Sequence, residues 1–307
     1  MEKISYYSLN NYLRDTFGCK VYKVSLNAGF TCPNRDGRID TRGCIFCSKG
    51  GSGEFAGKPM LSLTEQLKQG KQLISSKLPK DETVKYIGYF QAYTNTYAPV
   101  EVLRMKYEEV MADPDVVAIS IATRPDCLSL EVLDLLEELN RTKPVWVELG
   151  LQTIHEASAK YIRRGYELPV YDRAVSELTK RGIYVVTHVI IGLLGETKED
   201  MLMTVKYVAD SPVKGIKLQL LHVLKDTDLA TDYEEGKFDV LSMEEYIDIV
   251  KDCLRILPPD MVVHRLTGDG DKKILIAPQW SKDKKRVLNA LKSSVNSLCQ
   301  LTKIIEK

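Results

Sequence analysis

Apolar segments rich in β-branched residues recur along the first two-thirds of the chain. They lack the strict alternation of polar and apolar positions, which is typical of strands that are covered on both faces in a parallel sheet. Such burial requires helices between the strands. Six strands are predicted in this way, at 21–26, 84–91, 116–123, 145–151, 184–191 and 215–223.

Helical patterns separate these strands, and three of them begin with a capping-box sequence followed by apolar residues at three- and four-residue spacing. Alternating strands and helices predict an α/β fold with functional groups at the carboxyl ends of the strands. An open doubly wound sheet and a partial six-unit barrel of the TIM type, (β/α)6, both fit this pattern. The three capping boxes pair Ser62 with Glu65, Thr153 with Glu156 and Ser242 with Glu245.

The regular alternation ends near residue 224. We therefore expect a partial barrel over 1–224 and a C-terminal extension over 225–307 that packs on it, with one helix near 243–256. Acidic side chains outnumber basic ones in the first part of this extension. The reverse holds in the second part, where a long basic helix is predicted from residue 282. This basic segment is either a solvated helix face or a phosphate-binding patch.

Composition places the 307-residue chain among ordinary globular proteins, since 44% of its residues are hydrophobic and 28% are charged. This length suits one main domain. Charged residues appear early, and no apolar run precedes a small-residue cleavage site. The N-terminal sequence therefore predicts a cytoplasmic protein without a membrane segment.

The cysteines are seven in number and dispersed, which favours metal binding or catalysis over a disulfide scaffold. Three of them follow the first predicted strand. Two residues separate Cys44 from Cys47, and eleven separate Cys32 from Cys44. The intervening loop contains glycine and proline and can bring all three thiolates to one metal centre. The sites at Cys127, Cys253 and Cys299 are apolar and favour buried thiols that act as small hydrophobic side chains.

Three thiolates suit a [4Fe–4S] cluster whose fourth iron stays open to another ligand. The alternative is a zinc site with Cys19 as fourth ligand, in a binding module without catalysis. Cys19 lies before the first strand, whereas the other three cysteines follow it, where catalytic loops of α/β barrels lie. Phe46 also suits a site that packs an adenine. We therefore favour the cluster.

Several segments resemble the radical S-adenosylmethionine (SAM) superfamily. The eleven-residue spacing departs from the commonest pattern but is similar to that of a subgroup with the Elongator catalytic subunit and oxygen-independent coproporphyrinogen oxidase. This resemblance implies a [4Fe–4S] cluster held by the three cysteines, SAM as its ligand, a reducing electron donor and a 5′-deoxyadenosyl radical. VELGLQT also resembles this subgroup. Within it, a small bacterial radical SAM family closely resembles this chain in LNAGFTCPNRDG, IATRPDCL, HVIIGLLGET and RLTGDG…APQW.

The resemblance also implies contacts with SAM from the fourth predicted strand and the loop after it. It assigns them to Gln152 and to Arg164, whose guanidinium suits the methionyl carboxylate. Arg164 beside Gly165 is equally typical of a cation at a helix C-terminus. Glu148 is expected to accept from the ribose or ammonium of SAM, or else to form a salt bridge at the barrel mouth.

Two further strand ends carry expected SAM contacts. His188, on the fifth predicted strand, matches a polar residue near the ribose, although a lone histidine there is also typical of a hydrogen-bonded core residue. The second strand ends in IGYFQAYTN without the Gly-Gly-Glu of many superfamily members, so Gln91 is expected to replace it. Gly192 and Gly195 resemble a turn near the adenine, a role that any βα loop can also require.

The substrate implied by the resemblance is tRNA. The matching small bacterial family has been connected with the wobble uridine, where a 5-carboxymethylaminomethyl group becomes 5-aminomethyl. A methyltransferase would then act downstream. A small metabolite or a protein side chain remains the alternative substrate.

Candidate substrate contacts lie in two regions of the chain. Arg124 and Asp126 follow the third strand and either face the substrate or form an internal salt bridge. The C-terminal candidates are basic and aromatic, and phosphate contacts from such residues should weaken steeply with salt. These candidates are Arg265, Trp280, Lys284, Lys285 and Arg286.

Overall fold

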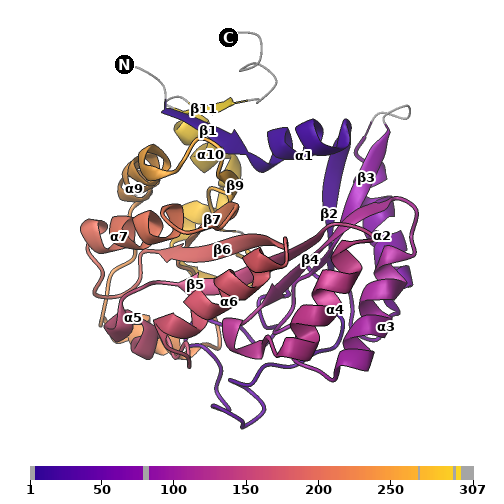
Figure 1. Cartoon of the computed structure of the whole chain (residues 1–307). Coiled ribbons are helices and arrows are strands. Elements are labelled where there is room, and N and C mark those ends of the chain that lie inside the picture. The colour runs from indigo at the N-terminus through magenta and orange to yellow at the C-terminus, as the bar shows by residue number, and fades with distance from the viewer. Residues whose placement is uncertain (1–3, 79–82, 269, 293–294, 299–307) are drawn as a thin grey trace.

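The computed structural model describes residues 4–78, 83–268, 270–292 and 295–298. Within these ranges, nine parallel strands form one sheet in the order β11-β1-β9-β7-β6-β5-β4-β3-β2. The sheet curls, and helices cover its outer face (Figure 1). A pair of short antiparallel strands, β8 and β10, forms a separate ribbon.

All six predicted strands are confirmed. Each hydrogen-bonds to the next along the chain, so the order never reverses as it does in a doubly wound sheet. The fold is therefore a partial barrel of the TIM type. The six strands are β2 (Lys20–Leu26), β3 (Val84–Phe90), β4 (Val116–Thr123), β5 (Val145–Gln152), β6 (Tyr184–Ile191) and β7 (Gly215–Leu220).

Helices connect these strands and bury their apolar sides against the sheet. The predicted cap at Ser62 is confirmed, since its side chain accepts from the backbone N–H of Glu65. The predicted cap at Thr153 is wrong, because the Thr153 hydroxyl donates to Glu196 at 2.5 Å and the N-cap residue is His155. The helices are α2 (Leu63–Ser75), α3 (Val100–Met111), α4 (Leu130–Asn140), α5 (Glu156–Tyr161), α6 (Leu168–Lys180) and α7 (Lys198–Ala209), with a short 3-10 helix η1 (Pro125–Cys127).

The chain after β7 returns to the same sheet. The predicted helix is confirmed as α9, with a complete capping box at Ser242, and the next strand, β9, pairs with β7. The predicted basic helix is present as α10 but is shorter than expected, because a 3-10 turn precedes it and a strand follows it; residues 293–294 and 299–307 of the predicted segment lie outside the described residues. These elements are β8 (Val223–Leu224), α8 (Asp228–Glu234), α9 (Met243–Ile256), β9 (Val262–Arg265), β10 (Leu275–Ala277), η2 (Gln279–Lys282), α10 (Lys284–Lys292) and β11 (Val295–Leu298).

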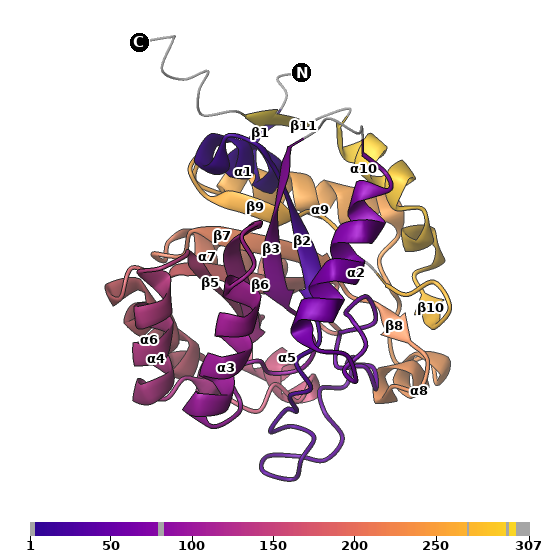
Figure 2. The same cartoon turned by 90° about the vertical axis from the view of Figure 1, so that its right-hand side faces the viewer.

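The N-terminal segment joins the sheet beside this returning chain. Strand β1 (Ile4–Ser8) pairs with both β9 and β11, and α1 (Leu9–Phe17) leads into β2. The two ends of the described chain therefore lie side by side (Figures 1 and 2). The division of the chain at residue 224 stays a prediction.

Charged residues within the barrel show how far the sheet curls. Lys23 on β2 and Lys217 on β7 lie at opposite ends of the six-strand run, yet both contact Glu148 on β5. This arrangement requires the inner face of the sheet to close around Glu148. The loop between β2 and α2 projects beyond the carboxyl ends of the strands, at the bottom of Figure 2.

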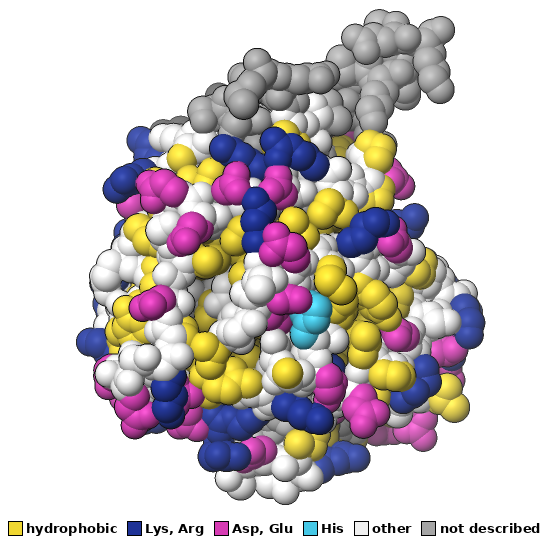
Figure 3. Space-filling view, turned by 90° about the vertical axis from the view of Figure 1, so that its left-hand side faces the viewer, with side chains coloured by type: hydrophobic (Ala, Val, Ile, Leu, Met, Phe, Trp, Pro, Cys, Tyr) yellow, Lys and Arg dark blue, Asp and Glu magenta, His cyan; other side chains and the backbone are white. Residues whose placement is uncertain are grey.

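The outer face over α7 and α9 carries acidic and basic side chains side by side (Figure 3). Lys198 on α7, for example, pairs with Asp248 and Asp252 on α9, each at 2.5 Å. This face therefore lacks a continuous surface of one charge. Among the described residues, every helix is too short or too polar to cross a lipid bilayer.

Candidate active site

A pocket of about 930 Å³ opens at the carboxyl ends of the barrel strands. The loop after β2, the strand ends and the C-terminal segment all contribute to its wall. Asp126, Trp280, Arg286 and Cys19 lie outside this lining, and Cys299 falls outside the described residues. The predicted residues that line the pocket are Cys32, Cys44, Phe46, Cys47, Gln91, Arg124, Glu148, Gln152, Arg164, His188, Arg265, Lys284 and Lys285.

Side chains next to Cys32 hold the cysteine loop in shape. The Arg35 guanidinium donates to the backbone carbonyls of Cys47 at 2.8 Å and Ser48 at 2.6 Å. Asn34 Nδ2 donates to Cys44 Sγ at 3.4 Å and to the Arg163 carbonyl at 2.7 Å. Sequence reasoning missed Asn34 and Arg35. Their position directly after Cys32 and Pro33 is the signal that could have found them.

The far part of the loop packs against the end of β3. The Tyr93 N–H donates to the Gly51 carbonyl at 2.9 Å, and Gln91 Nε2 donates to the Ser52 carbonyl at 2.7 Å. A Cβ atom on Gly51 would lie 2.4 Å from the Tyr93 ring, so this contact requires glycine. Gln91 therefore positions the loop. A direct contact of Gln91 with SAM stays a prediction.

The same loop also contacts the segments on the other side of the pocket. The Ile45 N–H donates to the carbonyl of Ile162, after α5, and the Ile45 carbonyl accepts from Leu229 of α8 at 3.1 Å. Phe46 packs with the apolar cluster around these residues. The cysteines are thus carried by a loop that is fixed at several points.

Burial raises the pKa of two thiols in the cysteine loop. It raises the pKa of Cys44 to about 11, and Cys47 adds to this effect. Burial also raises the pKa of Cys47, although the nearby Arg35 guanidinium opposes it. A metal that binds these sulfurs must displace their protons. In the described part of the chain, no three potential ligand side chains are already gathered around one point.

A buried ionic cluster lies deeper in the barrel and is centred on Glu148. One carboxylate oxygen accepts from Lys23 and from Ser120, each at 2.6 Å. The other accepts from Lys217 and, at 2.7 Å, from His188. Sequence reasoning named Glu148 and His188 but missed both lysines. Glu148 has the salt-bridged environment that was one of the two expectations for it, and its contact with SAM stays a prediction.

The cluster shifts the pKa values of its members. Burial alone would raise the pKa of Glu148, but Lys217 and Lys23 hold it well below its usual range. Burial lowers the pKa of His188 to about 4, and Lys217 adds to the effect. Burial also lowers the pKa of Lys217 to about 7 against the opposing charge of Glu148. His188 is therefore neutral at pH 7, and Glu148 is ionised.

The end of β5 supplies two more of the predicted residues. Gln152 adopts a positive φ of 70°, and its buried Oε1 has no hydrogen-bond partner among the described residues. Arg164 is buried, and its Nη1 donates to the Thr153 carbonyl at 2.7 Å while its Nε donates to the Tyr166 carbonyl at 3.0 Å. Arg164 thus ties β5 to the following loop. Its contact with SAM stays a prediction.

The candidate substrate residues have internal partners. Arg124 forms two hydrogen bonds with Asp126, at 2.9 and 2.8 Å, and also donates to the Arg164 carbonyl. The Trp280 indole N–H donates to the Leu241 carbonyl at 2.9 Å. Arg124 lines the pocket, and Trp280 packs on the adjoining core. Substrate contacts of these residues stay predictions.

Two family matches cover most of the chain. Residues 36–208 match the radical SAM superfamily, and residues 213–297 match the radical SAM C-terminal domain. The chain belongs to the radical SAM superfamily. Radical SAM enzymes use a [4Fe–4S] cluster and SAM, so both are cofactors of this enzyme.

Relatives of this radical SAM enzyme occur in bacteria and archaea. Protein YtqA of Bacillus subtilis is 50% identical over 95% of this chain and 90% of its own length. Protein YhcC of Escherichia coli is 36% identical over 87% of this chain and 85% of its own. A tRNA uridine(34) acetyltransferase of Methanocaldococcus infernus is 26% identical over 52% of this chain, which corresponds to 30% of that protein.

Solved structures confirm the fold of the radical SAM barrel. The archaeal Elp3 of Methanocaldococcus infernus superposes with a TM-score of 0.63 and 19% identity. The match covers 84% of this chain but 59% of that protein. Coproporphyrinogen III oxidase of Escherichia coli gives a TM-score of 0.50 with 16% identity, over 83% of this chain and 52% of that one. These likenesses concern the fold alone.

The residues of the pocket fit the cofactors of a radical SAM enzyme. Three cysteines on one loop line the pocket, and three thiolates are the donor set that a cluster with an open iron requires. The buried Oε1 of Gln152 is an acceptor that a bound ligand can satisfy, and its positive φ is the kind of strain that clusters at functional sites. The pocket volume also lies in the range of small-molecule sites.

Proposed function

We propose that this radical SAM enzyme acts on the wobble uridine of tRNA and converts a 5-carboxymethylaminomethyl group into 5-aminomethyl. The observation that carries the proposal is one pocket whose lining includes all three cysteines and a basic rim. The sequence match to tRNA uridine(34) acetyltransferases supports the choice of uridine. The lysines of the rim are Lys272, Lys273, Lys282, Lys284 and Lys285, which outnumber the two acidic residues of the same segments, Asp271 and Asp283.

In this proposal, Cys32, Cys44 and Cys47 hold the cluster, and Gln152 contacts SAM. When bound, the cluster and SAM supply a 5′-deoxyadenosyl radical that removes one hydrogen atom from the substrate. Asn34 and Arg35 keep the cysteine loop in place through the hydrogen bonds described above.

The proposed reaction balances with SAM as the two-electron acceptor. The carbon between the amine and the carboxylate loses a hydrogen atom and one electron, and the amine loses a proton, which gives a C=N bond. Water then hydrolyses this imine to the 5-aminomethyl group and glyoxylate. Bound SAM would accept the two electrons of this oxidation and would be recovered as methionine and 5′-deoxyadenosine, and the cluster would take back the electron that the substrate radical loses. An external low-potential donor supplies the first electron.

The rim lysines suit the RNA backbone. Lysines at the mouth of a pocket neutralise phosphates and guide a flexible loop inward. An anticodon loop is single-stranded, so its bases can leave their stack and enter such a pocket. The exposed primary amine of the product would suit a methyltransferase that acts next.

A strain without the gene tests this function. We expect its tRNA to accumulate 5-carboxymethylaminomethyluridine and to lose 5-aminomethyluridine and nucleosides made from it. The measurement is a digest of bulk tRNA followed by liquid chromatography and mass spectrometry. The wild-type gene should restore the profile, whereas Cys44→Ala should not. An unchanged nucleoside profile would reject tRNA and favour a metabolite or a protein side chain.

A further inference from the structure

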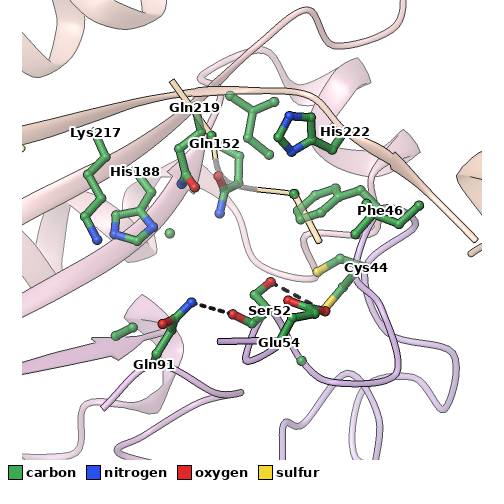
Figure 4. Close-up of a pocket in the computed structure, with 18 of the residues that line it drawn as sticks. Cys44, Phe46, Ser52, Glu54, Gln91, Gln152, His188, Lys217, Gln219 and His222 are labelled. Atoms are coloured by element: carbon green, nitrogen blue, oxygen red, sulfur yellow. Dashed lines mark hydrogen bonds between the residues drawn. The ribbon is translucent and has the colours of Figure 1, made fainter. Parts of the chain in front are cut away.

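Lys217 occupies an unusual position for a lysine. It lies in the middle of β7 between Ile216 and Leu218, and only 4% of it is exposed. Its side chain lines the pocket near His188, at the end away from Cys44 (Figure 4). A buried cation in such a strand requires anionic partners.

The anionic partner of Lys217 is Glu148, which it shares with a second lysine. Glu148 carries one negative charge and accepts from both Lys23 and Lys217. His188 adds no negative charge, because burial lowers its pKa and leaves it neutral. This region therefore holds more positive than negative charge. The excess lies on the pocket side, because Lys217 lines the pocket whereas Lys23 does not.

The hydrogen bonds of Lys217 also leave room for another acceptor. An ammonium group has three N–H donors. Among the residues that the structure describes, Lys217 donates to Glu148 and, at 3.2 Å, to the Tyr89 hydroxyl. Two donors are thus used, and the third is available to a ligand. Gln219 follows on the same face of β7 and also lines the pocket.

We propose that Lys217 binds a carboxylate of the substrate at the β7 side of the pocket. The inference rests on the proposed function, because the carboxymethylaminomethyl group carries such a carboxylate and an unmodified uridine does not. This contact makes Lys217 a specificity-determining residue. A bound anion would also oppose the lowered pKa of Lys217, so that substrate binding keeps the ammonium protonated.

Binding of synthetic anticodon stem-loops tests the inference. The cluster-loaded protein with SAM is titrated with RNA that carries 5-carboxymethylaminomethyluridine, its carboxamide analogue or plain uridine. We expect the carboxamide to bind about tenfold to a hundredfold more weakly than the carboxylate, the usual range for a charged hydrogen bond. Lys217→Met should bind both modified RNAs equally, and Lys217→Arg should keep part of the preference.

Lys23→Met is the matched control, because it removes the other ammonium from Glu148 without changing the pocket lining. It should keep a preference for the carboxylate, by a smaller factor, because Lys217 retains its third N–H donor while Glu148 no longer serves a second lysine. The comparison of the two modified RNAs on the unaltered protein does not depend on how any variant folds. Equal binding of both by that protein, together with normal turnover, would overturn the role of Lys217. A weaker affinity of Lys217→Met for SAM, with the RNA preference intact, would also overturn it.

The two proposals fail in different ways. If the unaltered protein binds and converts neither modified RNA better than the plain stem-loop, the tRNA function fails, and the substrate carboxylate fails with it. If the modified RNA is converted but its carboxylate makes no difference to binding, only the role of Lys217 fails.

Discussion

Replacement of Cys44 by alanine should reduce 5′-deoxyadenosine formation to the level of a reaction without protein. The physical reason is the donor count, since two remaining thiolates cannot hold a cubane with one open iron. The measurement is anaerobic reconstitution with iron and sulfide, chemical reduction, and quantification of 5′-deoxyadenosine made from SAM. Iron and sulfide content should fall together with activity.

Cys19→Ala is the control for this experiment. Cys19 precedes β2, whereas the cysteine loop follows it, so seven strand residues, or about 20 Å, separate the two sites. The variant should keep its cluster and its SAM cleavage. Full activity of Cys44→Ala would remove that residue from the ligand set. Tight zinc binding that depends on Cys19 would favour the alternative of a zinc module.

Glu148→Gln should lower the free energy of unfolding by about 3–5 kcal/mol, the usual cost of removing one partner from a buried ion pair. The substitution keeps the shape of the side chain but leaves Lys23 and Lys217 without a counter-charge inside the barrel. Urea unfolding at pH 6 is the suitable measurement. At that pH, below the pKa of about 7 for Lys217, the ammonium of the unaltered protein is protonated, so the reference state contains the intact ion pair.

The free energy of unfolding of the unaltered protein also depends on pH through Lys217. Between about pH 7 and the ordinary pKa of lysine, the unfolded chain binds more protons at Lys217 than the folded one does. This residue therefore makes stability rise with pH over that window.

Glu138→Gln is the control for Glu148→Gln, because Glu138 pairs with Arg104 at the surface, and its loss should change stability little. An equal effect of both substitutions would show that the cluster does not stabilise the barrel.

Long, strongly apolar segments made most of the fold predictable. Strands β3 to β7 are largely buried on both faces, so their hydrophobic residues stand out without knowledge of their neighbours. Strands β9 and β11 have four residues each, and β1 has five. Strands this short form because they pair with one another at the edge of the sheet. Local sequence does not contain that information.

The candidate site was predictable where residues lie close in sequence, as Cys44 and Cys47 do. The ionic cluster was not, because its members come from different strands and meet only when the sheet curls. A signal was nevertheless present, since Lys23 and Lys217 interrupt the apolar segments VYKVSL and GIKLQL. A lysine within a strand covered on both faces indicates a buried partner or a ligand. The predicted helix cap at Thr153 was wrong for a related reason. The Thr153 hydroxyl donates to Glu196, which lies on a loop that is distant in the sequence.

The most direct test of the proposed function is a reaction with purified components. The cluster-loaded protein, SAM and a low-potential reductant are incubated with tRNA that carries 5-carboxymethylaminomethyluridine. We predict equal amounts of 5-aminomethyluridine, glyoxylate and 5′-deoxyadenosine, all absent with Cys44→Ala. Steady formation of 5′-deoxyadenosine while the uridine side chain stays intact would contradict the proposed function.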